Sequence, residues 1–166
     1  MSDLHKIKIK PLFEDAIIPS RAFPTDSGLD LLIYKFECYY LPYDNLPIPL
    51  KDSFDSLALP AESRALIHTG IAATVGPGYE IQIRSRSGLA LKQGLIVLNA
   101  PGTVDEAYRN FLGVIICNTS KITQILTKGM KIAQMVACPV LTSDVLVVED
   151  LDETDRNMGG FGHTGV

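Results

Sequence analysis

The sequence has few of the residues that build metal centres or disulfide frameworks, and no long hydrophobic run. Its three cysteines and three histidines are widely scattered. This spacing argues against a disulfide framework and against a zinc site. No apolar run approaches the ~20 residues of a membrane span, and the first residues have the features of neither a signal peptide nor a transit peptide. We therefore expect a soluble, cytoplasmic protein that does not interact with membranes.

The sequence also has no excess of positive charge. Its formal net charge is −4, from 19 acidic and 15 basic residues. Generic nucleic-acid binding needs a basic surface, so nucleic acid is not an expected partner. Hydrophobic residues make up 46% of the 166 residues, which is ordinary for a single globular domain with a real core.

A helical period is also missing from all but one short stretch. Ile7 and Ile9 alternate with lysines, and Tyr79, Ile81 and Ile83 alternate with polar residues, which is typical of half-buried strands. Turn residues separate further short runs rich in Ile, Val and Leu: ALIHTGIAATV, GLIVLN, GVIICN, ITQILT, IAQMVACPV and DVLVVE. GLALKQ (88–93) is the one helical candidate. The pattern predicts an all-β sandwich, jelly roll or barrel with at most one short helix.

One region fits neither period. Residues 39–56, YYLPYDNLPIPLKDSFDS, contain three prolines and scattered aromatics. They predict a long loop or an irregular hairpin. Long loops in compact domains are often functional, but a tolerated surface insertion is the simpler explanation.

Three segments combine glycine with charge in a way that strands rarely do. They are TDSGLDL (25–31), RSRSGLA (84–90) and NAPGTVDEAYR (99–109). Backbone amides, hydroxyls and guanidinium groups that converge at a turn make a good phosphate site. Each segment also has a purely structural explanation, because Asp30 could cap a turn, Arg86 could pair with a carboxylate and Asp105 could begin a tight turn.

The last segment, RNMGGFGHTGV (156–166), joins an arginine and an aromatic ring to four glycines. Its glycines can expose backbone N–H groups to an anion. A disordered tail is the alternative. We predict a single domain over 1–155, with its insertion at about 39–56, followed by a flexible glycine-rich tail over 156–166.

Taken together, these segments resemble the five motifs of the trimeric deoxyuridine triphosphatases (dUTPases). The motifs occur in order as AFPTDSGLDL (22–31), RSRSGLA (84–90), NAPGTVDEAYR (99–109), GMKIAQMV (129–136) and RNMGGFGHTG (156–165). The chain departs from the usual pattern at Ser85, where proline is commoner, at Thr103 and Val104, and at Ala107, where a second aspartate is usual.

The resemblance implies a jelly-roll-like β-barrel subunit in a homotrimer with three active sites at subunit interfaces. Motifs one, two and four would come from one chain, motif three from a second and motif five from a third. The implied reaction is Mg²⁺-dependent hydrolysis of dUTP to dUMP and pyrophosphate. This activity serves nucleotide metabolism and keeps uracil out of DNA.

The resemblance also assigns roles in the chemistry. Asp105 would activate the water that attacks the α-phosphorus. Ser87, Gly88 and Gln134 match phosphate-contacting positions, and Arg86 matches the second motif with a partly structural role. The triphosphate would hold the Mg²⁺, with no direct protein ligand and with Asp30 near the water shell of the ion.

Further residues would recognise the nucleoside and close the site. Asn99, Gly102 and Val104 lie in the hairpin that would read the uracil edge, and Tyr108 would pack on the deoxyribose. In the tail, Phe161 would lie over the uracil and Arg156 would bind the γ-phosphate. Gly162 and His163 would close over the phosphates with them.

Two other functions stay open from the sequence. One is a dCTP deaminase of the same fold, which the aspartate at 105 and the segment GGFGHTG (159–165) argue against. The other is a non-catalytic dUTPase-like binding protein, which only the segment 39–56 favours.

Overall fold

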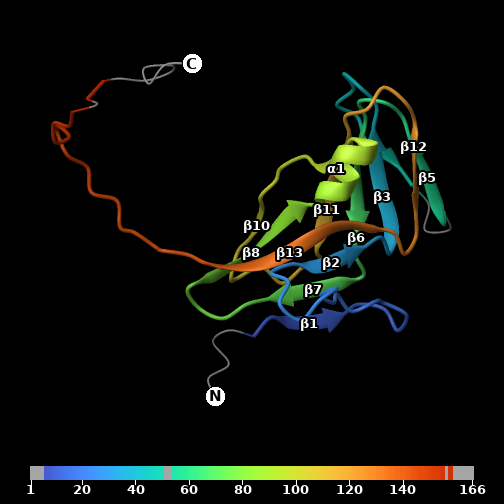
Figure 1. Cartoon of the computed structure of the whole chain (residues 1–166), viewed down its shortest axis with the longest axis horizontal. Coiled ribbons are helices and arrows are strands. Elements are labelled where there is room, and N and C mark those ends of the chain that lie inside the picture. The colour runs from blue at the N-terminus through green and yellow to red at the C-terminus, as the bar shows by residue number, and fades with distance from the viewer. Residues whose placement is uncertain (1–5, 51–53, 156, 159–166) are drawn as a thin grey trace.

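The structure is a computed structural model that describes residues 6–50, 54–155 and 157–158 (Figure 1). Within these residues it contains thirteen strands and one short helix. Their bounds are β1 Lys8–Pro11, β2 Leu29–Leu32, β3 Lys35–Tyr40, β4 Ile48–Pro49, β5 Ser56–Leu59, β6 Arg64–His68, β7 Ile71–Thr74, β8 Tyr79–Ser85, α1 Ser87–Gln93, β9 Leu95–Val97, β10 Gly102–Val104, β11 Gly113–Asn118, β12 Gln124–Thr127 and β13 Lys131–Pro139. The one helix is not long and apolar enough to cross a membrane.

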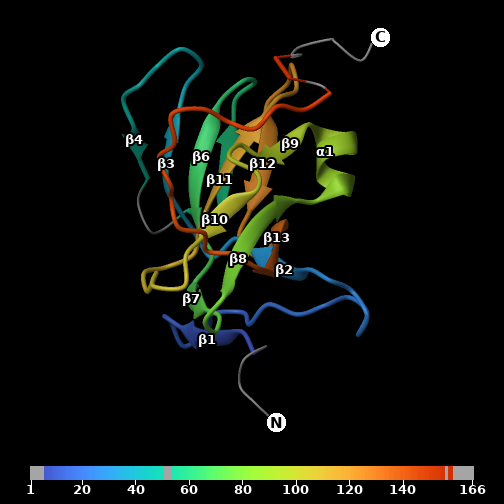
Figure 2. The ribbon, with the colours of Figure 1, turned by 90° about the vertical axis from the view of Figure 1, so that its left-hand side faces the viewer.

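The strands form two larger and two smaller antiparallel sheets (Figures 1 and 2). One sheet has the order β10-β8-β13-β2 and the other β4-β3-β6-β11-β9, while β1 pairs with β7 and β12 with β5. The expected alternation is plain in β11, where every second residue is buried, and it is also seen in β8. Large apolar side chains from both larger sheets fill the core, among them Leu31, Ile67, Ile81 and Ile116. The prediction of a jelly-roll-like β fold with one short helix is confirmed.

Helix α1 lies close to the expected residues 88–93 and has a defined end. Gly94 follows it with φ 66° and ψ 21°, a left-handed conformation that glycine adopts without steric cost. The Gly94 N–H donates to the carbonyls of Ala90 and Leu89. Because α1 begins two residues after β8 ends, the last residues of β8 and the first turn of the helix lie together.

The segment 39–56 contains an irregular hairpin, one of the two forms expected. Strand β4 pairs with β3 at Cys38↔Pro49 and Tyr39↔Ile48. Tyr43, near the tip, has a φ of 62° and is 97% exposed. Residues 51–53 lie outside the described part of the chain.

The chain leaves the sheets after β13 and runs away from them (Figure 1). The predicted strand at DVLVVE (144–149) is wrong, because no strand is present between 140 and 155. Val145, Leu146 and Val147 are more than 80% exposed. Their β-branched pattern is that of a strand, but a strand needs a partner to pair with, and a local pattern does not show whether one exists.

A buried asparagine joins two loops, the one between β5 and β6 and the one between β11 and β12. The side chain of Asn118 is fully buried. Its Nδ2 donates to the carbonyls of Leu59, Pro60 and Ile122 at 3.1, 3.0 and 2.8 Å. Its Oδ1 accepts from the N–H and the hydroxyl of Ser120. One amide therefore satisfies groups that water does not reach freely.

We predict that Asn118→Ala lowers the free energy of unfolding by about 1–3 kcal/mol, because it leaves buried carbonyls without a donor. Urea unfolding at one fixed protein concentration measures the change. Asn110→Ala is the control, since Asn110 is exposed and its side chain accepts a bond from the adjacent Phe111 N–H. It is expected to change stability by less than about 0.5 kcal/mol. Equal effects of the two variants would contradict the role given to Asn118.

Candidate active site

The largest candidate site is a cavity of about 510 Å³ between the loop before β2, the first turn of α1 and the middle of β13. Segments from motifs one, two and four of the sequence meet here, as the resemblance predicted. The residues that line it are Ala22, Asp26, Ser27, Gly28, Asp30, Arg86, Ser87, Gly88, Leu89, Lys92, Gln93 and Gln134. All five residues that were predicted for this part of the site, Asp30, Arg86, Ser87, Gly88 and Gln134, are among them.

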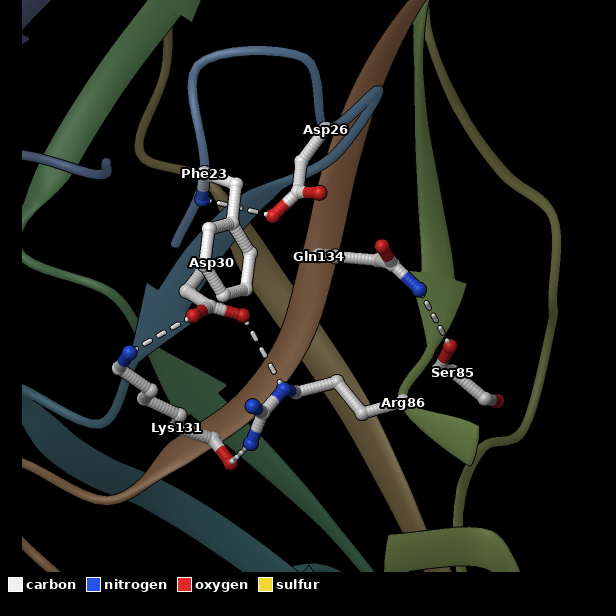
Figure 3. Close-up of polar contacts among 7 residues, drawn as sticks. All are labelled: Phe23, Asp26, Asp30, Ser85, Arg86, Lys131 and Gln134. Atoms are coloured by element: carbon white, nitrogen blue, oxygen red, sulfur yellow. Dashed lines mark hydrogen bonds and ion pairs between the residues drawn. The ribbon is translucent and has the colours of Figure 1, made fainter. Parts of the chain in front are cut away.

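Asp30 is the electrostatic centre of the cavity wall (Figure 3). Its Oδ1 lies 3.1 Å from Arg86 Nε and its Oδ2 lies 2.8 Å from Lys131 Nζ. Arg86 Nη1 also donates to the Lys131 carbonyl at 3.1 Å. The Asp30 side chain is only 14% exposed, so both cations compensate a carboxylate with little access to water. The carboxylate partner expected for Arg86 on structural grounds is therefore Asp30.

Gln134 is held by its neighbours on both sides. Its Nε2 donates to the Ser85 carbonyl at 3.0 Å, which leaves its Oε1 beside Gly28 (Figure 3). A Cβ at Gly28 would lie 2.2 Å from that oxygen. Glycine at this position therefore makes room for the carboxamide at the cavity wall.

The loop that forms the rim of the cavity is closed by Asp26. Its Oδ2 accepts the N–H of Phe23 at 2.9 Å, and its backbone carbonyl accepts from Arg21 Nε at 2.7 Å (Figure 3). The carboxylate of Asp26 therefore shapes the loop that precedes Asp30.

The opposite wall offers donors to an anion. The N–H groups in the first turn of a helix have no intrahelical acceptor, and here they belong to Ser87, Gly88 and Leu89. Arg86 and Lys92 add positive charge to the same wall. Amides, a hydroxyl and a guanidinium together suit a phosphate group. Among the described residues, no group of three or more carboxylates, histidines or cysteines could hold a metal ion on its own.

The residues of motif three form a second group on the connection from β9, which pairs with β11, to β10, which pairs with β8. A Cβ at Gly102 would lie 3.1 Å from Asn99 Nδ2, so glycine lets this side chain lie close to the start of β10. Asp105 directly follows β10 and is exposed. Its carbonyl accepts the Tyr108 N–H at 3.0 Å, and the Tyr108 hydroxyl donates to the Phe111 carbonyl at 2.9 Å.

Asp105 and the cavity lie toward opposite ends of β8. Val104 pairs with Ile81, and Asp105 extends further in the direction away from Arg86. Arg86 is five residues beyond Ile81, which at 3.3 Å per residue is about 16 Å along the strand. Asp105 is not among the described residues that line the cavity. One chain alone therefore does not bring Asp105 to the proposed phosphate site.

Four predicted site residues are not described by the structure, and other residues at the cavity had no predicted role. Arg156, Phe161, Gly162 and His163 lie outside the described residues. Lys131 and Gly28 were not given a role from sequence, although both stand within quoted motifs. Their roles depend on the register between β2 and β13, which pairs Gln134 with Asp30 and Lys131 with Leu32. Lys92 had no distinctive signal, because a lysine at the end of a helix is common.

Comparison with known proteins places these observations in a family. A family model described as dUTPase matches residues 52–165. A deoxyuridine 5'-triphosphate nucleotidohydrolase of Crocosphaera subtropica is 44% identical and covers 97% of this chain and 99% of its own length. One from Trichodesmium erythraeum is 46% identical, with 96% and 99% covered.

Solved structures agree in fold. A variant of the Staphylococcus bacteriophage 80alpha dUTPase with dUpNHpp has a TM-score of 0.74 at 24% identity and covers 97% of this chain and 99% of its own. A variant of the dUTPase from phage phi11 of S. aureus, described with a structural Mg(II) ion, has a TM-score of 0.69 at 24% identity, with 89% and 99% covered. The fold is that of the dUTPases. This chain belongs to the dUTPase family.

We predict that Gly28→Ala displaces the Gln134 carboxamide and lowers the free energy of unfolding by about 0.5–1.5 kcal/mol, the usual contribution of one hydrogen bond. Gly88→Ala is the matched control, because nothing lies within 4 Å of its added Cβ. It is expected to keep or slightly raise stability, since alanine favours the helix. Urea unfolding of both variants at one protein concentration tests the difference. Equal stability of Gly28→Ala and the parent would contradict the close approach to Gln134.

Proposed function

We propose that this protein hydrolyses dUTP to dUMP and pyrophosphate in a homotrimer whose active sites form between subunits. The relatives named deoxyuridine 5'-triphosphate nucleotidohydrolase support the reaction. The main support for a site shared between subunits is that Asp105 is separated from the phosphate cavity along β8. A complete site therefore takes the cavity from one subunit and Asp105 from another.

The cavity binds the triphosphate. The free N–H groups of the first turn of α1 and the Ser87 hydroxyl donate to phosphate oxygens, and Arg86 adds positive charge. Gln134 contributes its carboxamide. These groups are positioned before the substrate arrives, because Asp30 holds Arg86 and the Ser85 carbonyl holds Gln134. Positioned donors lower the cost of the charge that develops on the phosphates.

The residues of the cavity fit a magnesium ion that the triphosphate mainly holds. Both Asp30 oxygens are engaged by cations, so a direct metal bond would have to displace Arg86 or Lys131. Asp30 is therefore suited to the water shell of the ion and not to its first coordination sphere. When bound, Mg²⁺ supplies neutralisation of the triphosphate charge.

Asp105 acts as the general base. Its exposed carboxylate accepts a proton from the water whose oxygen bonds to the α-phosphorus, and the bond from that phosphorus to the bridging oxygen breaks. Pyrophosphate leaves with the electron pair of the broken bond, and dUMP remains. A carboxylate on an exposed turn at the edge of the sheet suits a role toward a neighbouring subunit.

The motif-three segment selects the nucleoside. Backbone groups near Asn99, Gly102 and Val104 read the uracil edge, and a tight turn there excludes the methyl group of thymine. The Tyr108 ring is fixed through its hydroxyl bond to the Phe111 carbonyl. It lies against the deoxyribose and excludes a 2′-hydroxyl.

The fifth motif comes from a third chain. The segment after β13 leaves its own sheets with several exposed apolar side chains, including Leu141, Val145 and Leu146. Covering these side chains against a neighbouring subunit would bury apolar area and carry residues 156–166 to that subunit's site. There Arg156 binds the γ-phosphate, Phe161 lies over the uracil, and Gly162 and His163 close over the phosphates.

Asp105→Asn is expected to lower kcat for dUTP by about 10²–10⁴-fold, the usual contribution of a general base, while dUpNHpp still binds. Pyrophosphate release from dUTP measures turnover, and calorimetric titration measures binding. Ammonia release from dCTP, assayed in parallel, tests the deaminase alternative. A variant that keeps kcat within tenfold of the parent would remove Asp105 from the role of base.

Two inactive variants should restore activity to each other if the site is shared. One chain carries Asp105→Asn, and the other lacks residues 156–166 but keeps Asp105. The subunits of an equal mixture are then allowed to exchange. A site is active when the chain that supplies its aspartate still has Asp105 and the chain that supplies its tail still has residues 156–166. Random assembly therefore gives about a quarter of the parent activity. Pyrophosphate release and sedimentation are measured together. Mixed trimers without recovered activity would mean that each chain completes its own site.

A further inference from the structure

The guanidinium of Arg109 lies at the outer side of the turn that carries Asp105. Its Nη1 donates to the Tyr108 carbonyl at 2.8 Å and also to the Glu106 carbonyl. The same nitrogen lies 3.1 Å from the hydroxyl oxygen of Thr74, the last residue of β7. One side chain thus joins two carbonyls of an exposed turn to a strand of a different sheet.

Thr74 reinforces this connection. Its hydroxyl donates to the Glu106 carbonyl at 3.0 Å, so this carbonyl accepts from both Thr74 and Arg109. Thr74 is itself held in the pair of β7 with β1, opposite Lys8. The turn is therefore attached to the paired strand β7 as well as to β10, which precedes it.

The attachment is made where the turn has few other restraints. Residues 105–110 are all exposed. Next to the turn is a cavity of about 300 Å³, with Thr74, Glu106 and Arg109 in its wall. Within the turn, the Tyr108 N–H closes back on the Asp105 carbonyl. Exposed turns with few packed neighbours fluctuate most, and two donors that fix the Glu106 carbonyl oppose that motion.

We propose that Arg109 and Thr74 are positioning residues that hold the 105–108 turn, and with it Asp105 and Tyr108, in the geometry for catalysis. The proposal rests on the function proposed above. Asp105 is the first residue of this turn and Tyr108 the last. One attachment therefore sets both the carboxylate that takes the proton from water and the ring that excludes a 2′-hydroxyl. A displacement of about 1 Å in such a group can cost on the order of a hundredfold in rate.

Arg109→Ala and Thr74→Val are expected to lower kcat for dUTP by about tenfold to a hundredfold with little change in KM, because Asp105 acts in the transition state. The ratio of kcat/KM for UTP to that for dUTP is expected to rise in both, because Tyr108 is released too. The double variant should lose less than the product of the single effects, since both side chains hold the same carbonyl.

Two control variants distinguish the positioning role from a general loss of structure. Thr74→Ser keeps the hydroxyl and should keep most of kcat, whereas Thr74→Val keeps the shape and loses the hydroxyl. Lys8→Ala removes a positive charge from the wall of the same cavity and should leave kcat unchanged. Thermal unfolding and sedimentation confirm that each variant remains folded and assembled.

The sharpest test places Arg109→Ala in a chain that already carries Asp105→Asn. If Arg109 acts through Asp105, the residual kcat should not fall further. A fall as large as in the parent background would overturn the proposal, as would a raised KM with unchanged kcat, which would make Arg109 a substrate contact. Parent-level turnover of Asp105→Asn alone would instead overturn the assignment of the base, so the two failures differ.

Discussion

The pairing of β8 with a strand on each side is the constraint on which the site depends. β13 pairs with β8 over seven positions, from Ala133↔Ser85 to Pro139↔Tyr79, and β10 pairs with its other edge. A strand held on both edges neither bends sharply nor shortens. The distance between its two ends is therefore fixed by the backbone, and Asp105 does not reach the cavity by a local rearrangement. The function proposed above joins them across two subunits.

Electrostatics gives the cavity its second constraint. The positive charges of Arg86 and Lys131 would repel each other when no substrate is bound. Asp30 lies between them and compensates both charges. The same carboxylate fixes the direction of Arg86 through Nε. Since Asp30, Arg86 and Lys131 come from three segments far apart in the sequence, the pairing order β8-β13-β2 is what brings them together.

The sequence predicted the parts of this architecture that have a local signal. Alternation identified β8 and β11, and a short helical pattern identified α1. The residues that line the cavity, apart from Lys92 and Gln93, stand in motifs that the structure brings together. The contacts of Lys131 with Asp30 and of Gly28 with Gln134 were not predictable, because they depend on the register of β13 against β2. The strand expected at 144–149 failed for a related reason, since a strand pattern does not reveal whether a pairing partner exists.

The exposed segment after β13 has a consequence for the solubility of the isolated chain. Val145, Leu146, Val147 and Val148 form a short unpaired run of high β propensity, the type of segment that stacks into aggregates. Asp144 precedes this run, and Glu149 and Asp150 follow it. Charged gatekeepers on both sides of an apolar run oppose the stacking of identical copies, because like charges would then lie 4.7–4.8 Å apart. The acidic flanks therefore protect a newly made chain from self-association of the wrong kind.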